Sequence, residues 1–519
     1  MSARSALALS AVALTACGLN QQGVPPPRDR IVYPSSAFVD PDGHWMYVAN
    51  SNSDLRYNSG TLVALDLDQV AADEAQAWDV CPKPDFVRSY DAPLDGVDDT
   101  ADHVRRCCWD YLDHNVLDCD ERAYVNEPST IEIGSFAAGL VFQPSAPGGC
   151  TPGTRHACSQ GCQDAADAGA SADAGADAGV TADAGTLPGG GASVAGRLFV
   201  GIRGNSSIVY ADTQSAGGKP ALSCTPPLPP MSPTSTTSAK GCALSEEPDV
   251  KPVVNVPEEP YALYLDSAQD LLYVGHLRGD TAHQDTGGVS LFDVQGRPKF
   301  VHPSRAFFPA DVSGSYGVTS LSYSDETKQL YATSRYVPMA VSLATSTNGD
   351  NACSEDLTMV TISPSSVSFT SPLAGSEMRG LKFVSPTRAF ALQRIPPALI
   401  GYQLTNGPLG NVATDFVETC AAPTFLDMAG EGDARRLFVT CFEAGQVYVV
   451  DPTIPQVVAT IDVGRGPAGL QFSPPGAGPA RAYVIGFGHN NVGVIDLEPG
   501  SPTQYHVIHK LGFPSVLPR

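Results

Sequence analysis

Apolar residues recur along the chain in seven short segments, each an aromatic or apolar residue followed by small apolar residues. Gly and Pro separate them from flanking stretches in which apolar and polar positions roughly alternate. Near-alternation with Gly and Pro breaks is typical of short β-strands. The seven segments are residues 45–50, 198–201, 272–275, 330–333, 389–392, 437–440 and 482–485.

The segment at 482–485 is the centre of the clearest repeat unit. We expect its four strands at residues 468–474, 481–487, 491–497 and 505–510. Four strands in about 45 residues match one blade of a β-propeller. The recurrence therefore predicts an all-β chain, a seven-bladed β-propeller.

Residues 47–50 read Tyr-Val-Ala-Asn, the turn before them at 40–43 reads Asp-Pro-Asp-Gly, and 446–451 read Gln-Val-Tyr-Val-Val-Asp. With these motifs the repeats resemble the YVTN-type seven-bladed β-propeller family. The resemblance covers residues 31–512 apart from insertions and is strong for blades 1, 6 and 7. It implies the propeller fold far more than an activity, because the family is a scaffold of varied roles.

Blades 1 and 2 are expected to be overlong because they carry insertions. Residues 71–129 are placed between the third and fourth strands of blade 1. Residues 145–192 and 214–251 are placed after the first and third strands of blade 2. These loops open on one face of a propeller, so a single disulfide-rich cap is expected there. The predicted blades are residues 33–133, 136–256, 260–308, 316–372, 379–419, 422–464 and 468–512.

Two further segments lack the residues to form a core. Residues 164–185 are Ala/Asp/Gly repeats and are predicted to be disordered. Residues 513–519 are expected to be a C-terminal tail. The 50 Gly and 44 Pro of the chain fit an architecture of many short strands and turns.

The N-terminus is interpreted as a targeting segment. Arg4 precedes an apolar run too short to cross a bilayer, and the run ends in small residues before Cys17. Residues 1–16 resemble a bacterial lipoprotein signal peptide, which implies lipidation (palmitate) at Cys17 and a tether at 17–30. The alternative is a plain secretory signal. Gly18, rather than Asp, follows Cys17, which favours the outer membrane of the cell envelope over the inner one.

The net charge of −24 limits the partners. Phosphate backbones require a basic surface, so nucleic acid is not an expected partner. We expect contact with the membrane through the lipid anchor, a protein or glycan partner, and a monomeric chain.

Export makes disulfides the expected state of the remaining cysteines. Cys420 and Cys441 should face each other at the ends of neighbouring strands of blade 6, which makes a bridge between them feasible. Cys353 is placed on the face opposite the cap. The cap cysteines are Cys81, Cys107, Cys108, Cys119, Cys150, Cys158, Cys162, Cys224 and Cys242.

No metal site or cofactor is predicted, although two alternatives remain. A Cys/His cluster (His103, Cys107, Cys108, His114, Cys119) fits no standard zinc spacing, and disulfides account for it better. A structural calcium ion is the second alternative. Its candidate ligands, in a stretch without the Gly and Glu of a helix–loop–helix calcium loop, are Asp110, Asp113, Asp118 and Asp120.

The candidate binding surface is the face opposite the cap, where second strands end at the rim of the central channel. Arg379 and Arg465 enter first strands at the same face. Clustered basic groups would receive a carboxylate or phosphate. The alternative is that the arginines pair with Glu258, Glu259 and Glu377 and tie blades together. The strand ends carry Asn50, Arg203, His276, Arg278, Arg335, Arg394 and His489.

The sequence favours a binding or interaction module over an enzyme. It contains no nucleophile-elbow, zincin or phosphate-loop motif, and no catalytic residue is assigned. One alternative is a metal-dependent propeller hydrolase of the lactonase kind. That function requires acids or histidines that converge on the channel. The other is a structural envelope protein that uses the cap as its contact surface.

Overall fold

A computed structural model describes most of the propeller. The described residues are 24–76, 107–110, 113, 115–144, 195–204, 206–216, 218–223, 259–267, 270–278, 288–294, 299–302, 317–325, 327–346, 361–405 and 411–512. Several predictions lie outside them: the signal segment, lipidation at Cys17, the 164–185 tract, the tail, His103 and His114. The cysteines outside them are Cys81, Cys150, Cys158, Cys162, Cys224, Cys242 and Cys353.

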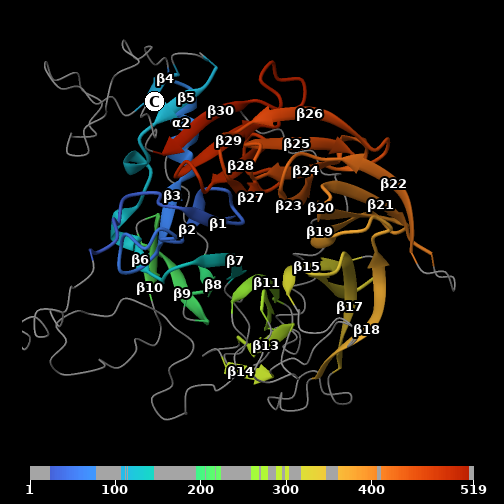
Figure 1. Ribbon diagram of the computed structural model, residues 1–519. Coiled ribbons are helices and arrows are strands. Elements are labelled where there is room, and N and C mark those ends of the chain that lie inside the picture. Colours follow the sequence, from blue (N-terminus) through green and yellow to red (C-terminus); the bar gives the residue numbers. More distant parts are fainter. Residues whose placement is uncertain are drawn as a thin grey trace, which may run out of the picture.

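Seven antiparallel sheets surround a central channel, which confirms the predicted seven-bladed β-propeller (Figure 1). The first four blades are β1 (Pro34–Val39), β2 (Trp45–Asn50), β3 (Thr61–Asp66) and β6 (Ile131–Glu132); β7 (Ala137–Pro144), β8 (Gly196–Ile202), β9 (Ser207–Ala216) and β10 (Lys219–Ser223); β11 (Pro260–Asp266), β12 (Leu271–His276), β13 (Val289–Asp293) and β14 (Lys299–His302); β15 (Val318–Ser324), β16 (Gln329–Ser334), β17 (Met339–Ser346) and β18 (Thr361–Thr370).

The last three blades have the same order, with the first strand innermost. They are β19 (Ser376–Ser385), β20 (Arg388–Ile395), β21 (Ala398–Gln403) and β22 (Val412–Glu418); β23 (Pro423–Ala429), β24 (Arg436–Cys441), β25 (Gln446–Asp451) and β26 (Gln456–Asp462); β27 (Pro467–Phe472), β28 (Arg481–Gly486), β29 (Asn491–Asp496) and β30 (Val507–Gly512).

The seven apolar segments are the second strands, which are buried on both faces. In β28, Tyr483 and Ile485 pack towards blade 1, whereas Ala482 and Val484 pack towards blade 6. Successive side chains of a strand point to opposite faces, so a strand between two neighbouring sheets needs an apolar residue at every position. This explains the continuous apolar runs in the sequence.

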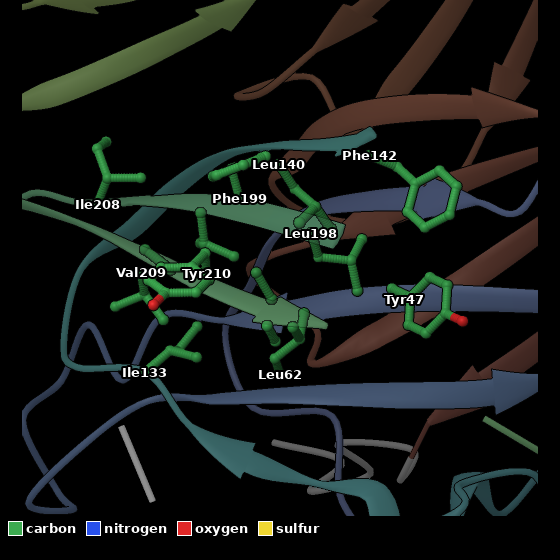
Figure 2. Close-up of a cluster of buried hydrophobic side chains, with 14 of the residues drawn as sticks. Tyr47, Leu62, Ile133, Leu140, Phe142, Leu198, Phe199, Ile208, Val209 and Tyr210 are labelled. Atoms are coloured by element: carbon green, nitrogen blue, oxygen red, sulfur yellow. The ribbon is translucent and has the colours of Figure 1, made fainter. Parts of the chain in front are cut away.

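The core consists of such interfaces between neighbouring blades. Between blades 1 and 2, the rings of Tyr47 and Phe142 stack with centroids 6.5 Å apart, and Leu62 and Leu198 pack beside them (Figure 2). Outer strands are covered on one face only. The residues of β22 and β26 therefore alternate between exposed and part-buried or buried.

The helix and hairpin of the first insertion lie at the outer edge of blade 7, and its last described residues, near Asn126, pack on blades 1 and 2, so this part does not lie over a face as a cap. Helix α2 (Leu67–Glu74) follows β3 directly. The edge hairpin, β4 (Cys107–Trp109) and β5 (Leu117–Cys119), extends blade 7 to six strands because β5 pairs in parallel with β30 (Figure 1). The free edge of β30 offers unpaired backbone groups, and β5 satisfies them.

The predicted position of the third insertion is wrong. Strand β10 pairs with β9 through a tight turn, so the fourth strand of blade 2 lies at 219–223 instead of after residue 251. The long segment that follows therefore connects blade 2 to blade 3. Since strands alternate in direction, this connection leaves from the face that carries Arg203, opposite the predicted cap.

The end of the predicted tether packs on the fold. Arg30 is buried and lies 3.5 Å from Asp120 and 3.7 Å from Glu121. The Arg28 guanidinium donates a hydrogen bond to the carbonyl of Thr130 at 2.7 Å. These contacts hold the chain entry against blade 1. Within the described ranges, we find no helix with the length and apolar character that a membrane crossing requires.

Candidate functional site

A bulge recurs at the start of all seven first strands. In each, the register with the second strand shifts so that an extra residue is inserted into the first strand. A bulge redirects side chains locally, which is why bulges are common next to binding sites. The bulged residues line a central cavity of about 410 Å³ and are Ser35, Ala138, Tyr261, Thr319, Arg379, Thr424 and Ala468.

Two residues before the bulged residue, the chain turns into the first strand with a positive φ in six blades. Two of these residues, Glu259 and Glu377, are acidic, and the carboxylate of each meets an arginine at the channel mouth. The six are Tyr33, Phe136, Glu259, Glu377, Ala422 and Gly466.

Three arginines surround the carboxylate of Glu377. The guanidinium nitrogens of Arg335, Arg379 and Arg394 lie 3.5, 3.0 and 3.4 Å from its oxygens. Arg335 directly follows the second strand of blade 4, and Arg394 is the next-to-last residue of the second strand of blade 5. Arg379 is the bulged residue of blade 5. One carboxylate therefore lies among three positive charges contributed by two blades.

A fourth arginine, Arg203, extends this group towards blade 2. Its Nη2 lies 3.3 Å from Glu259, and its guanidinium lies over the ring of Tyr261 at 5.9 Å from the centroid. The same tyrosine accepts a hydrogen bond of 3.5 Å from Nη1 of Arg379. Tyr261 thus lies between Arg203 and Arg379.

The mouth is electropositive on this side. Four guanidiniums against two carboxylates leave a net charge of +2 in the group of Arg203, Arg335, Arg379, Arg394, Glu259 and Glu377. Among the described residues, the buried Nε–H donors of Arg203 and Arg379 have no hydrogen-bond acceptor. Buried guanidinium donors are usually satisfied by carboxylate or phosphate oxygens. Because these Nε–H groups are buried, an anion would meet the part-exposed guanidinium ends of Arg203, Arg335 and Arg394.

The opposite wall of the mouth is aromatic. Phe487 lies 5.4 Å from Tyr33 and 6.1 Å from Phe442 between ring centroids, and both phenylalanines line the cavity. Phe136 also lines it, next to Arg203, whose amide donates to the Phe136 carbonyl at 3.0 Å. Blades 1, 6 and 7 supply Tyr33, Phe442 and Phe487. The channel mouth is therefore cationic on one side and aromatic on the other.

Three of the seven predicted strand-end residues join this site: Arg203, Arg335 and Arg394. Asn50 is buried and serves the backbone, since its amide donates to Arg30 O and its Oδ1 accepts from Val32 N. The buried ring of His276 lies 2.8 Å from the Ser290 hydroxyl through Nε2. The hydrogen bonds of Asn50 fix the chain before β1, and the contact of His276 joins β12 to β13.

The two remaining predicted residues are Arg278 and His489. Arg278 is exposed beyond the end of β12. His489 follows β28, and burial, with the nearby charges of Arg465 and Lys510, lowers its pKa. A neutral imidazole at physiological pH adds no positive charge to an anion site.

Sequence reasoning missed Tyr261 and Lys382 and gave Arg379 only a secondary place. Lys382 lines the cavity and lies 2.6 Å from Asp427. The orientation of Tyr261 and Arg379 depends on the bulge, and no residue type marks the bulge in all seven blades. Gly or Pro at the entry of some first strands is the only local signal.

Two disulfides are described, and Cys420–Cys441 is the predicted bridge of blade 6. Cys107–Cys119 joins the two strands of the edge hairpin, and Cys108 is also disulfide-bonded. In the Asp-rich stretch considered for calcium, Nη2 of Arg122 lies 2.6 Å from Oδ2 of Asp120. Burial by itself would raise the pKa of Asp120, but the hydrogen bonds and charge of Arg122 outweigh burial, so the pKa of Asp120 is lowered.

No family model matches this sequence, and no curated protein does. Solved propeller structures resemble it only distantly. A Kuenenia stuttgartiensis hydrazine synthase chain has 11% identity and a TM-score of 0.46, over 94% of this chain and 99% of that one. A Lactobacillus plantarum protein has 13% identity and a TM-score of 0.41, over 61% and 82%. A candidate 6-phosphogluconolactonase of Bacteroides fragilis has 12% identity and a TM-score of 0.36, over 56% and 73%.

Proposed function

We propose that the chain is a binding module whose channel mouth holds an anionic ligand with an apolar body. The observation that carries this proposal is the net positive group around Glu377 opposite an aromatic wall. A carboxylate or phosphate would accept from the arginines of blades 2 to 5. Its apolar part would pack on Phe136, Phe442 and Phe487.

The alternative that the arginines only tie blades together accounts for part of the geometry. Arg203–Glu259 joins blades 2 and 3, and Arg335–Glu377 joins blades 4 and 5. An ion pair that only joins two blades, however, needs one cation for each carboxylate. Arg379 and Arg394 add two further charges to Glu377, and such crowding is unfavourable without another anion.

The hydrolase alternative finds less support. A propeller hydrolase needs acids or histidines that converge on the channel around a metal ion. The cavity lining, as far as the described ranges extend, contains Arg, Lys, Ser, Thr, Tyr and Gln but no Asp, Glu or His. This lining favours binding over metal-assisted hydrolysis.

The proposed location is the cell envelope, with a lipid at Cys17 as anchor and the outer membrane as the favoured site. The support is the sequence of residues 1–17 alone. Metabolic labelling with a radioactive fatty acid tests it. Cys17→Ala should abolish the label and move the chain from the membrane fraction to the soluble one. Label that persists in the variant contradicts the proposal.

Calorimetric titration of the purified full chain tests the ligand class. The probes are benzoate, laurate and phenyl phosphate, with acetate and benzyl alcohol as controls that lack the apolar body or the acidic group. We expect binding of at least one amphiphilic anion, and a loss of about tenfold or more when Arg203, Arg335 and Arg394 are changed to Ala.

A matched control exists within one strand. Arg388 and Arg394 lie near opposite ends of β20, each side chain is 27% exposed, and each pairs with a carboxylate, Asp415 and Glu377 respectively. Arg394→Ala should weaken binding of the anion, whereas Arg388→Ala should leave that affinity unchanged. Equal binding by wild type and both variants would overturn the assignment and leave the arginines as blade ties.

A further inference from the structure

A second polar cluster lies far from the channel, where the edge hairpin meets blade 7. Cys119 Sγ lies 2.9 Å from Nε2 of His509, a residue of β30 that is 390 positions away in sequence. The ligand atoms of Cys107, Cys119 and His509 all lie within 4.8 Å of one another. All three side chains are fully buried.

A carboxylate completes the cluster. Oδ2 of Asp73, in α2, lies 4.0 Å from Cys107 Sγ, and Asp73 is also fully buried. Tyr124 donates its hydroxyl proton to this oxygen at 2.7 Å, and the amides of Gln69 and Gln76 donate to the other oxygen at 3.2 and 3.3 Å. These three donors fix the orientation of the Asp73 carboxylate.

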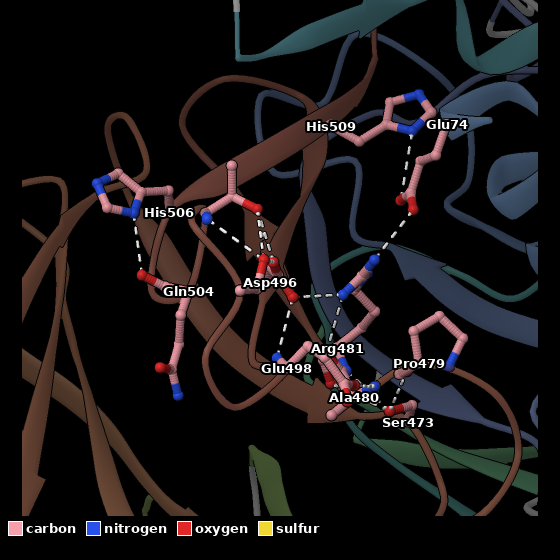
Figure 3. A network of polar contacts seen from close by, with 12 residues as sticks. Glu74, Ser473, Pro479, Ala480, Arg481, Asp496, Glu498, Gln504, His506 and His509 are labelled. Atoms are coloured by element: carbon pink, nitrogen blue, oxygen red, sulfur yellow. Dashed lines mark hydrogen bonds and ion pairs between the residues drawn. The ribbon is translucent and has the colours of Figure 1, made fainter. Parts of the chain in front are cut away.

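A carboxylate also lies near the histidine, whose buried Nδ1 has no hydrogen-bond partner among the described residues. Glu74 Oε1 lies 3.9 Å from Nδ1 of His509, while its other oxygen lies 3.3 Å from Arg481 (Figure 3). Approach of Glu74 to hydrogen-bond distance would favour the tautomer with the proton on Nδ1, which leaves Nε2 free to bind a metal, as in most zinc-bound histidines. The Nε2 of His509 faces the two sulfurs.

We infer that Cys107, Cys119, His509 and Asp73 form a zinc site when the two cysteines are in the dithiol state. Their disulfide is the oxidised form of the same site. In a tetrahedral site with Zn–S bonds of about 2.3 Å and Zn–N bonds of about 2.0 Å, ligand atoms lie roughly 3.3–3.8 Å apart. The Cys and His ligand atoms already lie within 4.8 Å of one another, so they need only the opening of the S–S bond and small side-chain shifts, whereas the Asp73 carboxylate, 4.0 Å from Cys107 Sγ, has to move towards the other two ligands.

The two states exclude each other chemically. Binding of Zn²⁺ by the dithiol releases the two thiol protons and forms two Zn–S bonds. A disulfide oxidant that accepts two electrons from the thiolates forms the Cys107–Cys119 bond and releases Zn²⁺. Oxidising conditions therefore select the disulfide, and reducing conditions with zinc select the metal.

The metal would connect parts of the fold that the disulfide does not. The disulfide links only β4 to β5, within the edge hairpin. Zinc would also bind α2 through Asp73 and β30 through His509. It would thus join the insertion of blade 1 to blade 7 and reinforce the closure of the ring between the first and last blades.

The test uses the full chain, reduced with a phosphine and treated with Zn²⁺ or Co²⁺ after metal removal. We expect one more tightly bound zinc in the reduced wild type than in His509→Ala or Asp73→Asn. The reduced wild type with Co²⁺ should show the thiolate charge-transfer band and the strong visible bands of a tetrahedral site. Both signals should disappear when a disulfide oxidant is added.

His506→Ala is the matched control, because His506 is exposed just before β30 and should not change either signal. If a ligand variant fails to fold, Glu74→Gln keeps the ligand set and should weaken zinc affinity by about 10–100-fold through His509. Equal zinc content and cobalt spectra in the wild type, His509→Ala and Glu74→Gln would overturn the inference and assign any bound metal to other cysteines.

Discussion

Nη1 of Arg379 in blade 5 lies 3.5 Å from the hydroxyl of Tyr261 in blade 3, across the whole width of blade 4. Both are bulged residues of first strands, and the residue between them at the same level is Thr319. The side chain of Thr319 in blade 4 is small, and this leaves the space through which Arg379 reaches Tyr261. The bulge thus creates a continuous polar wall on one side of the channel.

Glu377 is expected to compete with the ligand for the arginines. Glu377→Gln should increase the affinity for the anionic probe by about tenfold, because it removes a negative charge at contact distance from three guanidiniums. The loss of charged hydrogen bonds should lower the free energy of unfolding by about 1–2 kcal/mol. Calorimetry and urea denaturation measure the two effects.

Asp415→Asn is the control for Glu377→Gln, because Asp415 pairs with Arg388 at the other end of β20. It should leave the anion affinity unchanged. An unchanged or weaker affinity in Glu377→Gln itself would show that the arginine group does not receive the anion.

Stability should depend on the protonation of Glu121. Burial, and then the charge of Asp120, raise the pKa of Glu121 to about 7 from its ordinary value of 4.5. Between these two pH values the folded chain holds a proton that the unfolded chain has released, so the free energy of unfolding falls as pH rises. The fall is on the order of 3 kcal/mol.

Denaturant titrations across this pH window measure the effect of Glu121. Glu121→Gln should remove this part of the decrease, whereas Glu127→Gln, at an exposed position of the same segment, should retain it. The same pH slope in wild type and Glu121→Gln would contradict the prediction.

The turn into the first strand should tolerate glycine better than other residues. Gly466 has φ +69°, and an added Cβ would lie 2.8 Å from the amide nitrogen of Gly488. Gly466→Ala should therefore lower the free energy of unfolding by about 1–2 kcal/mol. Ala422 has φ +52° at the equivalent position. Ala422→Gly should be close to neutral, because relief of strain offsets the added chain entropy.

Equilibrium unfolding of both turn variants under identical conditions measures the difference. Equal destabilisation by Gly466→Ala and Ala422→Gly would show that the positive φ is not a shared constraint of the blades.

The Cys420–Cys441 bridge should contribute about 3 kcal/mol, because it closes a loop with a sequence separation of 21. The double variant Cys420→Ala/Cys441→Ala should lose this amount in denaturant unfolding without reductant. Phe442 directly follows Cys441, so the aromatic wall should loosen and the affinity for laurate should fall more than that for benzoate. Unchanged stability would mean that the bridge does not form in solution.

Much of the fold was predictable because it depends on local patterns. An unbroken apolar run such as 482–485 is required wherever a strand packs between two sheets, so seven runs specified seven second strands. The Cys420–Cys441 pair followed from the same register. The position of the third insertion was not predictable in this way, because β10 has little apolar signal and is recognised only by its pairing with β9.

The sequence by itself determined the number of blades, the second strands and the basic residues at their ends. Only the tertiary structure decided which of those residues meet. A bulge turned Tyr261 and Arg379 into the channel, Asn50 and His276 were buried among polar contacts, and His509 came within 2.9 Å of Cys119. Periodicity records the burial of each strand, whereas contacts between distant residues depend on backbone register and sheet closure, for which a single chain carries no local signal.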